Sequence, residues 1–399
     1  MNISNIKMLL LTKAASNVAS VVCSNSTTWY LTTSGDLYGC GSGGYGKQGN
    51  GSTDNVLTFT KRASNVKDFA CSTDTTWYID NNGDLYGCGY NSNGQQGSGG
   101  YSNVTTFTKR ASGVASFACS TYTTWYIDNN NDLYGCGSGG QGKQGNGSIS
   151  DVTTFSKCAS NVVQVACSDN TTWYLTTSGD LYGCGSSRYG QQGNGSTDNV
   201  LTFTKRVSNV ASVACLNSTT WYLTTSGDLY GCGYNFFGQQ GSGNTSNVLT
   251  FTKRASNVKD FACSTDTTWY IDNNGDLYGC GYNSYGQQGS GSTSDVLTFT
   301  KRVSNVKDFV CSDTVTWYLI TSGDLYGCGW GSYGQQGSDG TSSITSFTKR
   351  ASNVKGFACS NWTTWYIDNN GNLYGCGRSS QGQQSSGDTT NVLTFTKRN

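Results

Sequence analysis

The stretch that decides the fold is Asp84-Leu85-Tyr86-Gly87-Cys88-Gly89, which returns along the chain at a constant step of 48 residues. Its first residue falls at Asp36, Asp84, Asp132, Asp180, Asp228, Asp276 and Asp324, with a variant at Asn372. The Trp of each Thr-Trp-Tyr segment keeps the same step from Trp29 to Trp365, and a Phe keeps it from Phe59 to Phe395. Eight complete units without insertion or deletion indicate a repeat architecture.

Within one unit the pattern predicts four short strands. Residues 66–71 are apolar-rich, 75–80 are β-branched and aromatic, 85–89 carry the repeated motif, and 104–109 follow a Gly-rich stretch. Residues 81–84 (Asn-Asn-Gly-Asp) have the composition of a hairpin turn, and no 3.6-residue periodicity is present. Four strands in a unit of about 40–50 residues are typical of a β-propeller blade, which buries its faces against its neighbours. We therefore expect an all-β propeller of eight four-stranded blades.

Residues 83–97 (Gly-Asp-Leu-Tyr-Gly-Cys-Gly-Tyr-Asn-Ser-Asn-Gly-Gln-Gln-Gly) resemble the repeat of the regulator of chromosome condensation (RCC1) family, as do residues 66–71. The resemblance covers residues 8–399 and implies a β-propeller. Members of that family usually have seven blades, whereas the count here favours eight. The chain departs from the family pattern at Ser72 and Thr75, where Gly and His are usual, and at Cys88, where Trp is usual.

The repeats divide the chain into a propeller domain, residues 18–399, and an N-terminal segment, residues 1–17. From Met8 to Lys13 this segment copies the fourth strand of a unit, so the chain holds nine such strands for eight blades. We expect the extra strand to latch the ring of a monomer, because closed rings hide their edges. The alternative is that it pairs with an exposed edge of another molecule and forms an oligomer.

The composition argues against an enzyme. The chain has no His and no Glu, which removes Ser-His-Asp and Cys-His nucleophile systems, His-type zinc sites and Glu acid–base catalysis. No cofactor or metal site is expected, because the Asp-x-Asn-x-Asp spacing from Asp80 to Asp84 is better explained as a hairpin turn. The 17 Cys recur at spacings that do not fit zinc sites. Buried free thiols and a cytoplasmic location are expected, with disulfides between blades as the alternative.

Charge and hydropathy exclude further classes. The net charge of +1 argues against nucleic acid as the main partner. No apolar run approaches the roughly 18 residues of a membrane span, so no membrane association is expected. The apolar run at residues 8–11 is too short for a secretory signal.

The candidate binding residues come from one face of the propeller. In an antiparallel blade, the loop between the first two strands and the loop between the last two emerge together. Here these loops are irregular and aromatic, and Trp330 and Trp362 are the two Trp outside the repeated position. We expect the partner-binding residues to be Trp330, Trp362, Tyr333, Tyr282, Tyr285, Phe236, Phe237, Tyr234 and Arg378. The alternative is that these rings fold over and cap the tops of the blades.

The opposite face carries repeated Lys-Arg pairs and turn Asp residues. We expect a solvated surface of mixed charge there, with a phosphate-binding ring as the alternative. The sequence as a whole predicts a non-catalytic scaffold that presents its aromatic loops to a protein partner. Glycan binding by the repeated loops is a second possibility. The role of the family's namesake, nucleotide exchange on a Ran-type GTPase with chromatin binding, is disfavoured because the units carry no insertion and the chain has no basic tail.

Overall fold

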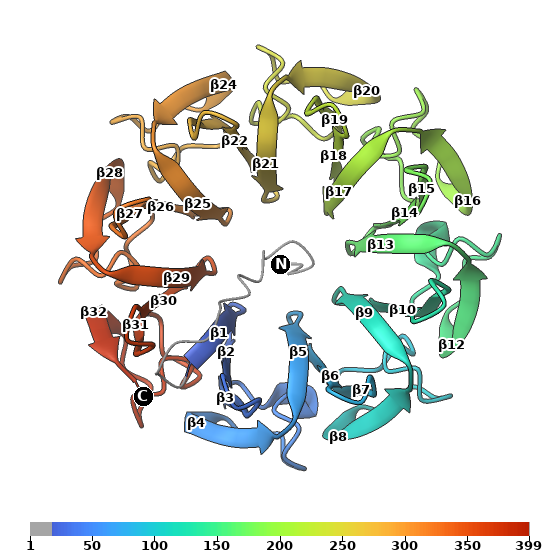
Figure 1. Ribbon diagram of the computed structural model, residues 1–399, viewed down its shortest axis with the longest axis horizontal. Coiled ribbons are helices and arrows are strands. Elements are labelled where there is room, and N and C mark those ends of the chain that lie inside the picture. The colour runs from blue at the N-terminus through green and yellow to red at the C-terminus, as the bar shows by residue number, and fades with distance from the viewer. Residues whose placement is uncertain (1–17, 399) are drawn as a thin grey trace.

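The computed structural model describes residues 18–398, which form eight four-stranded antiparallel sheets arranged as blades around a central axis (Figure 1). Each blade is one 48-residue unit, and its strands pair in chain order. The predicted eight-bladed β-propeller is confirmed. The proposed latch strand at residues 8–13 lies outside the described residues.

The four strands of a blade run from the centre of the ring to its rim (Figure 1). The innermost strands are β1 Val18–Cys23, β5 Val66–Cys71, β9 Val114–Cys119, β13 Val162–Cys167, β17 Val210–Leu216, β21 Val258–Cys263, β25 Val306–Cys311 and β29 Val354–Cys359. The second strands are β2 Thr27–Thr32, β6 Thr75–Asp80, β10 Thr123–Asp128, β14 Thr171–Thr176, β18 Thr219–Thr224, β22 Thr267–Asp272, β26 Val315–Ile320 and β30 Thr363–Asp368. The third strands are β3 Leu37–Gly41, β7 Leu85–Gly89, β11 Leu133–Gly137, β15 Leu181–Gly185, β19 Leu229–Gly233, β23 Leu277–Gly281, β27 Leu325–Gly329 and β31 Leu373–Gly377. The rim strands are β4 Val56–Ala63, β8 Val104–Ala111, β12 Val152–Ala159, β16 Val200–Val207, β20 Val248–Ala255, β24 Val296–Val303, β28 Ile344–Ala351 and β32 Val392–Lys397. Two 3-10 turns, η1 Gly44–Gly46 and η2 Gly140–Gly142, lie in loops of blades 1 and 3.

The core lies between blades. Each repeated Trp is fully buried and meets the Phe of the next blade's rim strand, as Trp29 meets Phe107 edge-on with ring centroids 6.0 Å apart. Trp77 on β6 pairs directly with Gly87 on β7, and a Cβ at Gly87 would collide with the Trp77 ring. The repeated motif therefore needs its first Gly because the indole lies over that position. The prediction that these Trp are core residues is confirmed.

The same kind of packing closes the ring. Blade 8 (β29 to β32) and blade 1 (β1 to β4) share an apolar cluster that includes Trp365, Ile367 and Tyr30. Phe59 of β4 lies edge-on to Trp365 at 5.7 Å, and Thr28 Oγ1 donates to the Gln383 carbonyl oxygen at 2.9 Å. Within residues 18–398 every blade takes all four strands from its own unit, so closure relies on face-to-face packing.

The face that carries the hairpin turns, named the turn face here, has mixed charge as predicted. At the turn of blade 2, Asp80 Oδ1 accepts the backbone N–H groups of Asn82 and Asp84. Seven Lys–Asp ion pairs then join the rim strands to the turns, with N–O distances of 2.6–2.9 Å. The Arg that follows most of these Lys is half-buried and not fully solvated, as at Arg62, where burial lowers the guanidinium pKa.

The cysteines are all free thiols, as predicted. Fifteen are buried, and Cys158 and Cys311 are half-buried. Burial raises the pKa of Cys23 to about 12 and that of Cys158 to about 11, which disfavours the reactive thiolate. In the part of the chain that the structure describes, no helix has the length and apolar character needed to cross a membrane.

Candidate interaction surface

The loops of the face opposite the turn face, named the loop face, are held by buried amide side chains. In blade 2, Gln96 Nε2 donates to the Cys88 carbonyl oxygen at 2.9 Å, and Asn91 Oδ1 accepts the Gln96 N–H at 2.7 Å. Gln95 Nε2 reaches the Thr121 carbonyl oxygen of the next blade, while its Oε1 accepts the Asn93 N–H. The Gln-Gln pairs therefore fix each loop to its own blade and to its neighbour, as their amide chemistry predicts.

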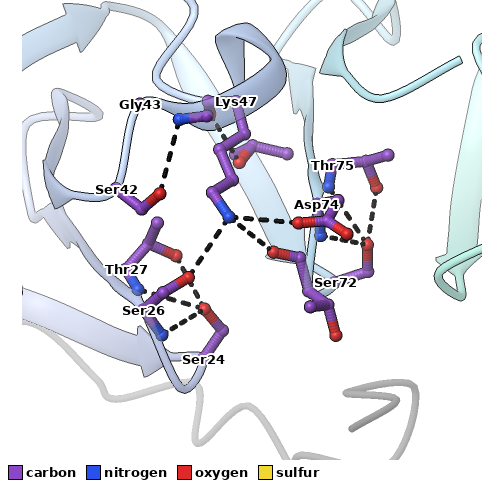
Figure 2. A network of polar contacts seen from close by, with 12 residues as sticks. Ser24, Ser26, Thr27, Ser42, Gly43, Lys47, Ser72, Asp74 and Thr75 are labelled. Atoms are coloured by element: carbon purple, nitrogen blue, oxygen red, sulfur yellow. Dashed lines mark hydrogen bonds and ion pairs between the residues drawn. The ribbon is translucent and has the colours of Figure 1, made fainter. Parts of the chain in front are cut away.

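In blade 1 a lysine, Lys47, takes the place of the first Gln. Figure 2 shows its ammonium donating to the Thr73 carbonyl oxygen at 3.0 Å, to Ser26 Oγ at 3.2 Å and to Asp74 Oδ1 at 3.2 Å. Lys47 is 5 % exposed. This network joins loops of blades 1 and 2, which confirms that the two kinds of loop emerge on one face.

Seven of the nine predicted binding residues make contacts that follow one geometric rule. The rule concerns the loop between the third and fourth strands of each blade. The fourth residue of this loop contacts the first residue of the equivalent loop in the next blade. Phe237 meets Tyr282 at 4.7 Å, and Tyr285 stacks on Trp330 at 5.3 Å with an interplanar angle of 29°. In the last such pair an arginine replaces the ring, since the Arg378 guanidinium lies 5.2 Å from the Tyr333 centroid.

Contacts within blades join these pairs into one chain of rings, here named the aromatic arc. Tyr234 and Phe236 are 6.4 Å apart, Phe236 and Phe237 are 5.1 Å apart, and Tyr282 and Tyr285 are 5.9 Å apart. Trp330 and Tyr333 are 5.2 Å apart, and Tyr333 is 6.3 Å from Trp362. The arc consists of Tyr189, Tyr234, Phe236, Phe237, Tyr282, Tyr285, Trp330, Tyr333, Trp362 and Arg378, and it crosses blades 4 to 8.

The ends of the arc carry cations. Arg378 covers the Trp362 ring at 4.2 Å, which is a cation–π contact. At the other end, Tyr189 meets Tyr234 at 5.0 Å and lies beneath Arg188 at 5.6 Å. Tyr189 is a member that sequence reasoning missed, although it occupies the same loop position as Phe237 and Tyr285.

The exposure of the arc is uneven. Phe236 is 61 % exposed, whereas the other predicted residues are half-buried because each ring covers part of the next. Both sequence alternatives thus describe part of the surface: the rings cap their blades, and their outer faces remain accessible. The arc is one continuous strip of half-exposed rings.

The loop face is also acidic, which the small net charge of the whole chain conceals. Within residues 18–398 its loops hold ten Asp and four basic residues. The acidic residues are Asp54, Asp74, Asp151, Asp169, Asp198, Asp266, Asp295, Asp313, Asp339 and Asp388; the basic ones are Lys47, Lys143, Arg188 and Arg378. The turn face differs, because its Lys-Arg pairs lie beside turn Asp residues that form ion pairs with the Lys.

Asp266 is the most perturbed acid of this face. Burial, together with the carboxylates of Asp313 and Asp295, raises its pKa to about 7. Burial raises the pKa of the Tyr234 phenol, and the nearby Asp266 carboxylate raises it further. Asp266 therefore lies beside the arc.

Comparison with known proteins begins with the repeat itself. A family model described as "Regulator of chromosome condensation (RCC1) repeat" matches residues 162–191 and 258–287, which are parts of blades 4 and 6. No curated protein sequence matches the chain.

Solved structures agree with the fold. Prp20p from Saccharomyces cerevisiae, whose structure was described with its binding properties to Gsp1p and histones, superposes with a TM-score of 0.66 and 19 % identity over 83 % of this chain and 91 % of that one. Yeast RCC1 (Prp20) bound to Kap60 gives a TM-score of 0.65 and 18 % identity, covering 90 % and 94 %. Human WBSCR16 gives 0.57 and 17 %, covering 86 % and 85 %. The chain is therefore an eight-bladed β-propeller, and segments of two of its blades match the RCC1 repeat.

Proposed function

We propose that this protein is a non-catalytic binding scaffold that captures a protein partner on the aromatic arc of its loop face. The observation that carries the proposal is the continuity of the arc, in which neighbouring ring centroids lie 4.7–6.4 Å apart from Tyr189 to Trp362. Aromatic side chains and Arg are the residues most enriched among those that dominate protein–protein binding energy.

The scaffold supports this role in two ways. The loops that carry the arc are tied to the blades by buried Gln side chains, so little conformational entropy is lost on binding. Structurally similar propellers also bind proteins: Prp20p was studied for its binding to Gsp1p and histones, and it was crystallised with Kap60. These neighbours favour a protein as the partner.

The test compares partner capture by three versions of the full chain. The natural chain, a Trp330→Ala/Trp362→Ala double variant and a Tyr101→Ala control are immobilised and exposed to lysate of the source organism. Tyr101 is 56 % exposed on a loop outside the arc, so its removal deletes an aromatic surface of similar kind. We expect a protein retained by the natural chain and the control and lost, by at least tenfold, from the double variant.

Three results would contradict this proposal. Equal retention by all three chains removes the arc from the binding site. Retention that fades steeply with salt and does not depend on the arc places binding on the Lys-Arg pairs of the turn face. Arc-dependent binding on a glycan array, without a protein partner, favours the lectin-like alternative. Circular dichroism and thermal unfolding of each variant establish that it is folded.

A further inference from the structure

The acidic character of the loop face is concentrated where the arc is richest in rings. In blades 5 to 7 the described loops of this face contain Asp266, Asp295, Asp313 and Asp339 and no Lys or Arg. The four cations of the face belong to blades 1, 3, 4 and 8. Charge alone therefore favours a basic ligand for this sector, but a more specific observation comes from the internal duplication.

Residues 65–92 and 257–284 are identical in sequence, so the molecule contains the same acid twice, as Asp74 in blade 2 and as Asp266 in blade 6. The two loops also have the same local geometry, since the N–H of each Asp donates to a Ser Oγ at 3.4 Å. The two carboxylates nevertheless have different neighbours. Asp295 and Asp313 lie near Asp266 where the first copy has Asn103 and Thr121, and the preceding blades differ as well.

The preceding blades differ in the side chain that faces the carboxylate. Blade 1 supplies Lys47, whose ammonium lies 3.2 Å from Asp74 Oδ1. Blade 5 supplies Gln239 at the equivalent position. The Gln239 amide is already engaged, because Nε2 donates to the Thr265 carbonyl oxygen at 3.2 Å and Oε1 accepts the Phe237 N–H at 3.0 Å. Within residues 18–398 the Asp266 carboxylate has no hydrogen bond or ion pair.

A pair of rings recurs at equivalent positions in the two copies. Tyr45 and Tyr90 lie 4.9 Å apart in the first copy, and Phe237 and Tyr282 lie 4.7 Å apart at the equivalent positions in the second. The first copy is therefore an occupied example, inside this molecule, of an ammonium held by this Asp.

We propose that Asp266, at the junction of blades 5 and 6, binds a lysine side chain of a basic polypeptide segment, which supplies the ammonium that Lys47 supplies to Asp74. The site rests on the proposed function, since it specifies the chemistry of the partner that lies along the aromatic arc. The rings of Tyr234, Phe237 and Tyr282 border the incoming side chain, and the acidic sector of blades 5 to 7 attracts the rest of the basic segment.

The experiment uses a defined probe, a fluorescein-labelled nine-residue peptide of alternating Gly and Lys, and measures its affinity for the full chain by fluorescence anisotropy. The natural chain is expected to bind one peptide, with affinity that falls as salt is added. Asp266→Asn is expected to weaken binding at least tenfold. Gln239→Lys is expected to do the same, because it places a lysine of the chain itself where blade 1 has Lys47.

The matched control is Lys47→Gln, which turns the first copy into the second and is expected to raise the stoichiometry from one peptide to two. A peptide of identical sequence with acetylated lysines is expected not to bind. Absence of binding to the natural chain, binding unaffected by both Asp266→Asn and Gln239→Lys, or equal binding of the acetylated peptide would each overturn the proposal. Partner capture that depends on Trp330 and Trp362 but not on Asp266 would leave the proposed scaffold function standing without this lysine site.

Discussion

Lys47 and Gln239 occupy equivalent positions in blades 1 and 5, yet they give the neighbouring Asp residues different electrostatic surroundings. Lys47 forms an ion pair with Asp74. Gln239 Nε2 donates to the Thr265 carbonyl oxygen, and its neutral amide provides no cation for Asp266. The backbones of the two loops differ as well. In blade 5 the Gln239 Oε1 accepts the N–H of Phe237, two residues earlier. Lys47 has no acceptor atom for the N–H of Tyr45, and Tyr45 has a φ of 62° in the 3-10 turn η1. The two copies therefore differ in both loop conformation and local charge.

The charge of Asp266 predicts a pH-dependent gain of stability for Asp266→Asn. The folded-state pKa of about 7 lies above the ordinary value of 3.8, so the folded chain holds a proton that the unfolded chain has released between these values. Stability is therefore lost as pH rises from about 4 to 7. The variant should be more stable than the natural chain above pH 7 by about 1–2 kcal/mol, after allowance for solvent screening, and equal to it below pH 4. Urea unfolding across pH 4–8 measures the difference.

The control for this experiment is Asp74→Asn. It removes a carboxylate that is paired with Lys47 and should lower stability at neutral pH, opposite in sign to Asp266→Asn. A similar gain of stability in both variants would mean that the ion pair with Lys47 does not distinguish Asp74 from Asp266.

At the scale of the element, a blade is defined by how its second and third strands fit. In every blade the repeated Trp pairs across the ladder with the first Gly of the third-strand motif, as Trp77 does with Gly87. The indole lies flat over that Gly and extends toward the Phe of the next blade. Strand pairing within a blade and packing between blades thus depend on the same two residues, which explains why the motif and the Trp keep one spacing.

Gly87→Ala is accordingly expected to lower stability by about 1–3 kcal/mol, because the added methyl group overpacks against the Trp77 ring. Gly100→Ala serves as the matched control, since a Cβ there meets nothing within 4 Å. The midpoint of guanidinium unfolding, followed by Trp fluorescence, reports both. Equal midpoints for the two variants would mean that the Trp77 ring can move away from the added methyl group without a loss of stability.

At the scale of the whole molecule, the eight junctions are not equal. Six of them carry an isolated β-bridge between a loop and the next rim strand, such as Asn50 with Thr106. Among residues 18–398 the two junctions of blade 8 have no such bridge. The accompanying backbone hydrogen bonds are also longer there, 3.3 Å at Asp339 and 3.1 Å at Gly387, against 2.8–2.9 Å at the other six. Asp339 and Ser385 stand where most blades have Gly, with φ of 59° and 55°.

Blade 8 is therefore predicted to be the first part of the ring to open. In native-state hydrogen exchange, the amides of β29 to β32 should exchange faster than the equivalent amides of β13 to β16, since local opening follows the weakest contacts. Uniform protection of all eight blades would contradict the prediction. Repeating the measurement after deletion of residues 1–17 tests the latch: faster exchange confined to blades 1 and 8 supports it, and no change argues against it.

Much of the fold follows from the sequence alone, because strand pairing within a blade joins residues close in the chain. The count of blades, the strands at residues 66–71 and 75–80, the buried Trp and the assignment of loops to faces are all determined by a 48-residue period and local alternation. The rim strand of blade 2, expected at 104–109, extends to Ala111 because strand ends depend on hydrogen bonds that the pattern does not contain.

The binding surface needed the tertiary structure. Sequence reasoning placed Tyr285, Trp330 and Arg378 on one face, but their contacts join residues about 45 positions apart, and only the angle between blades brings them within reach. The same angle brings Lys47 to Asp74 and Gln239 to the loop of Asp266, although the two Asp lie in identical segments. Local pattern thus determined the blades, and the packing of one blade against the next decided the arc, its charge and its accessible carboxylate.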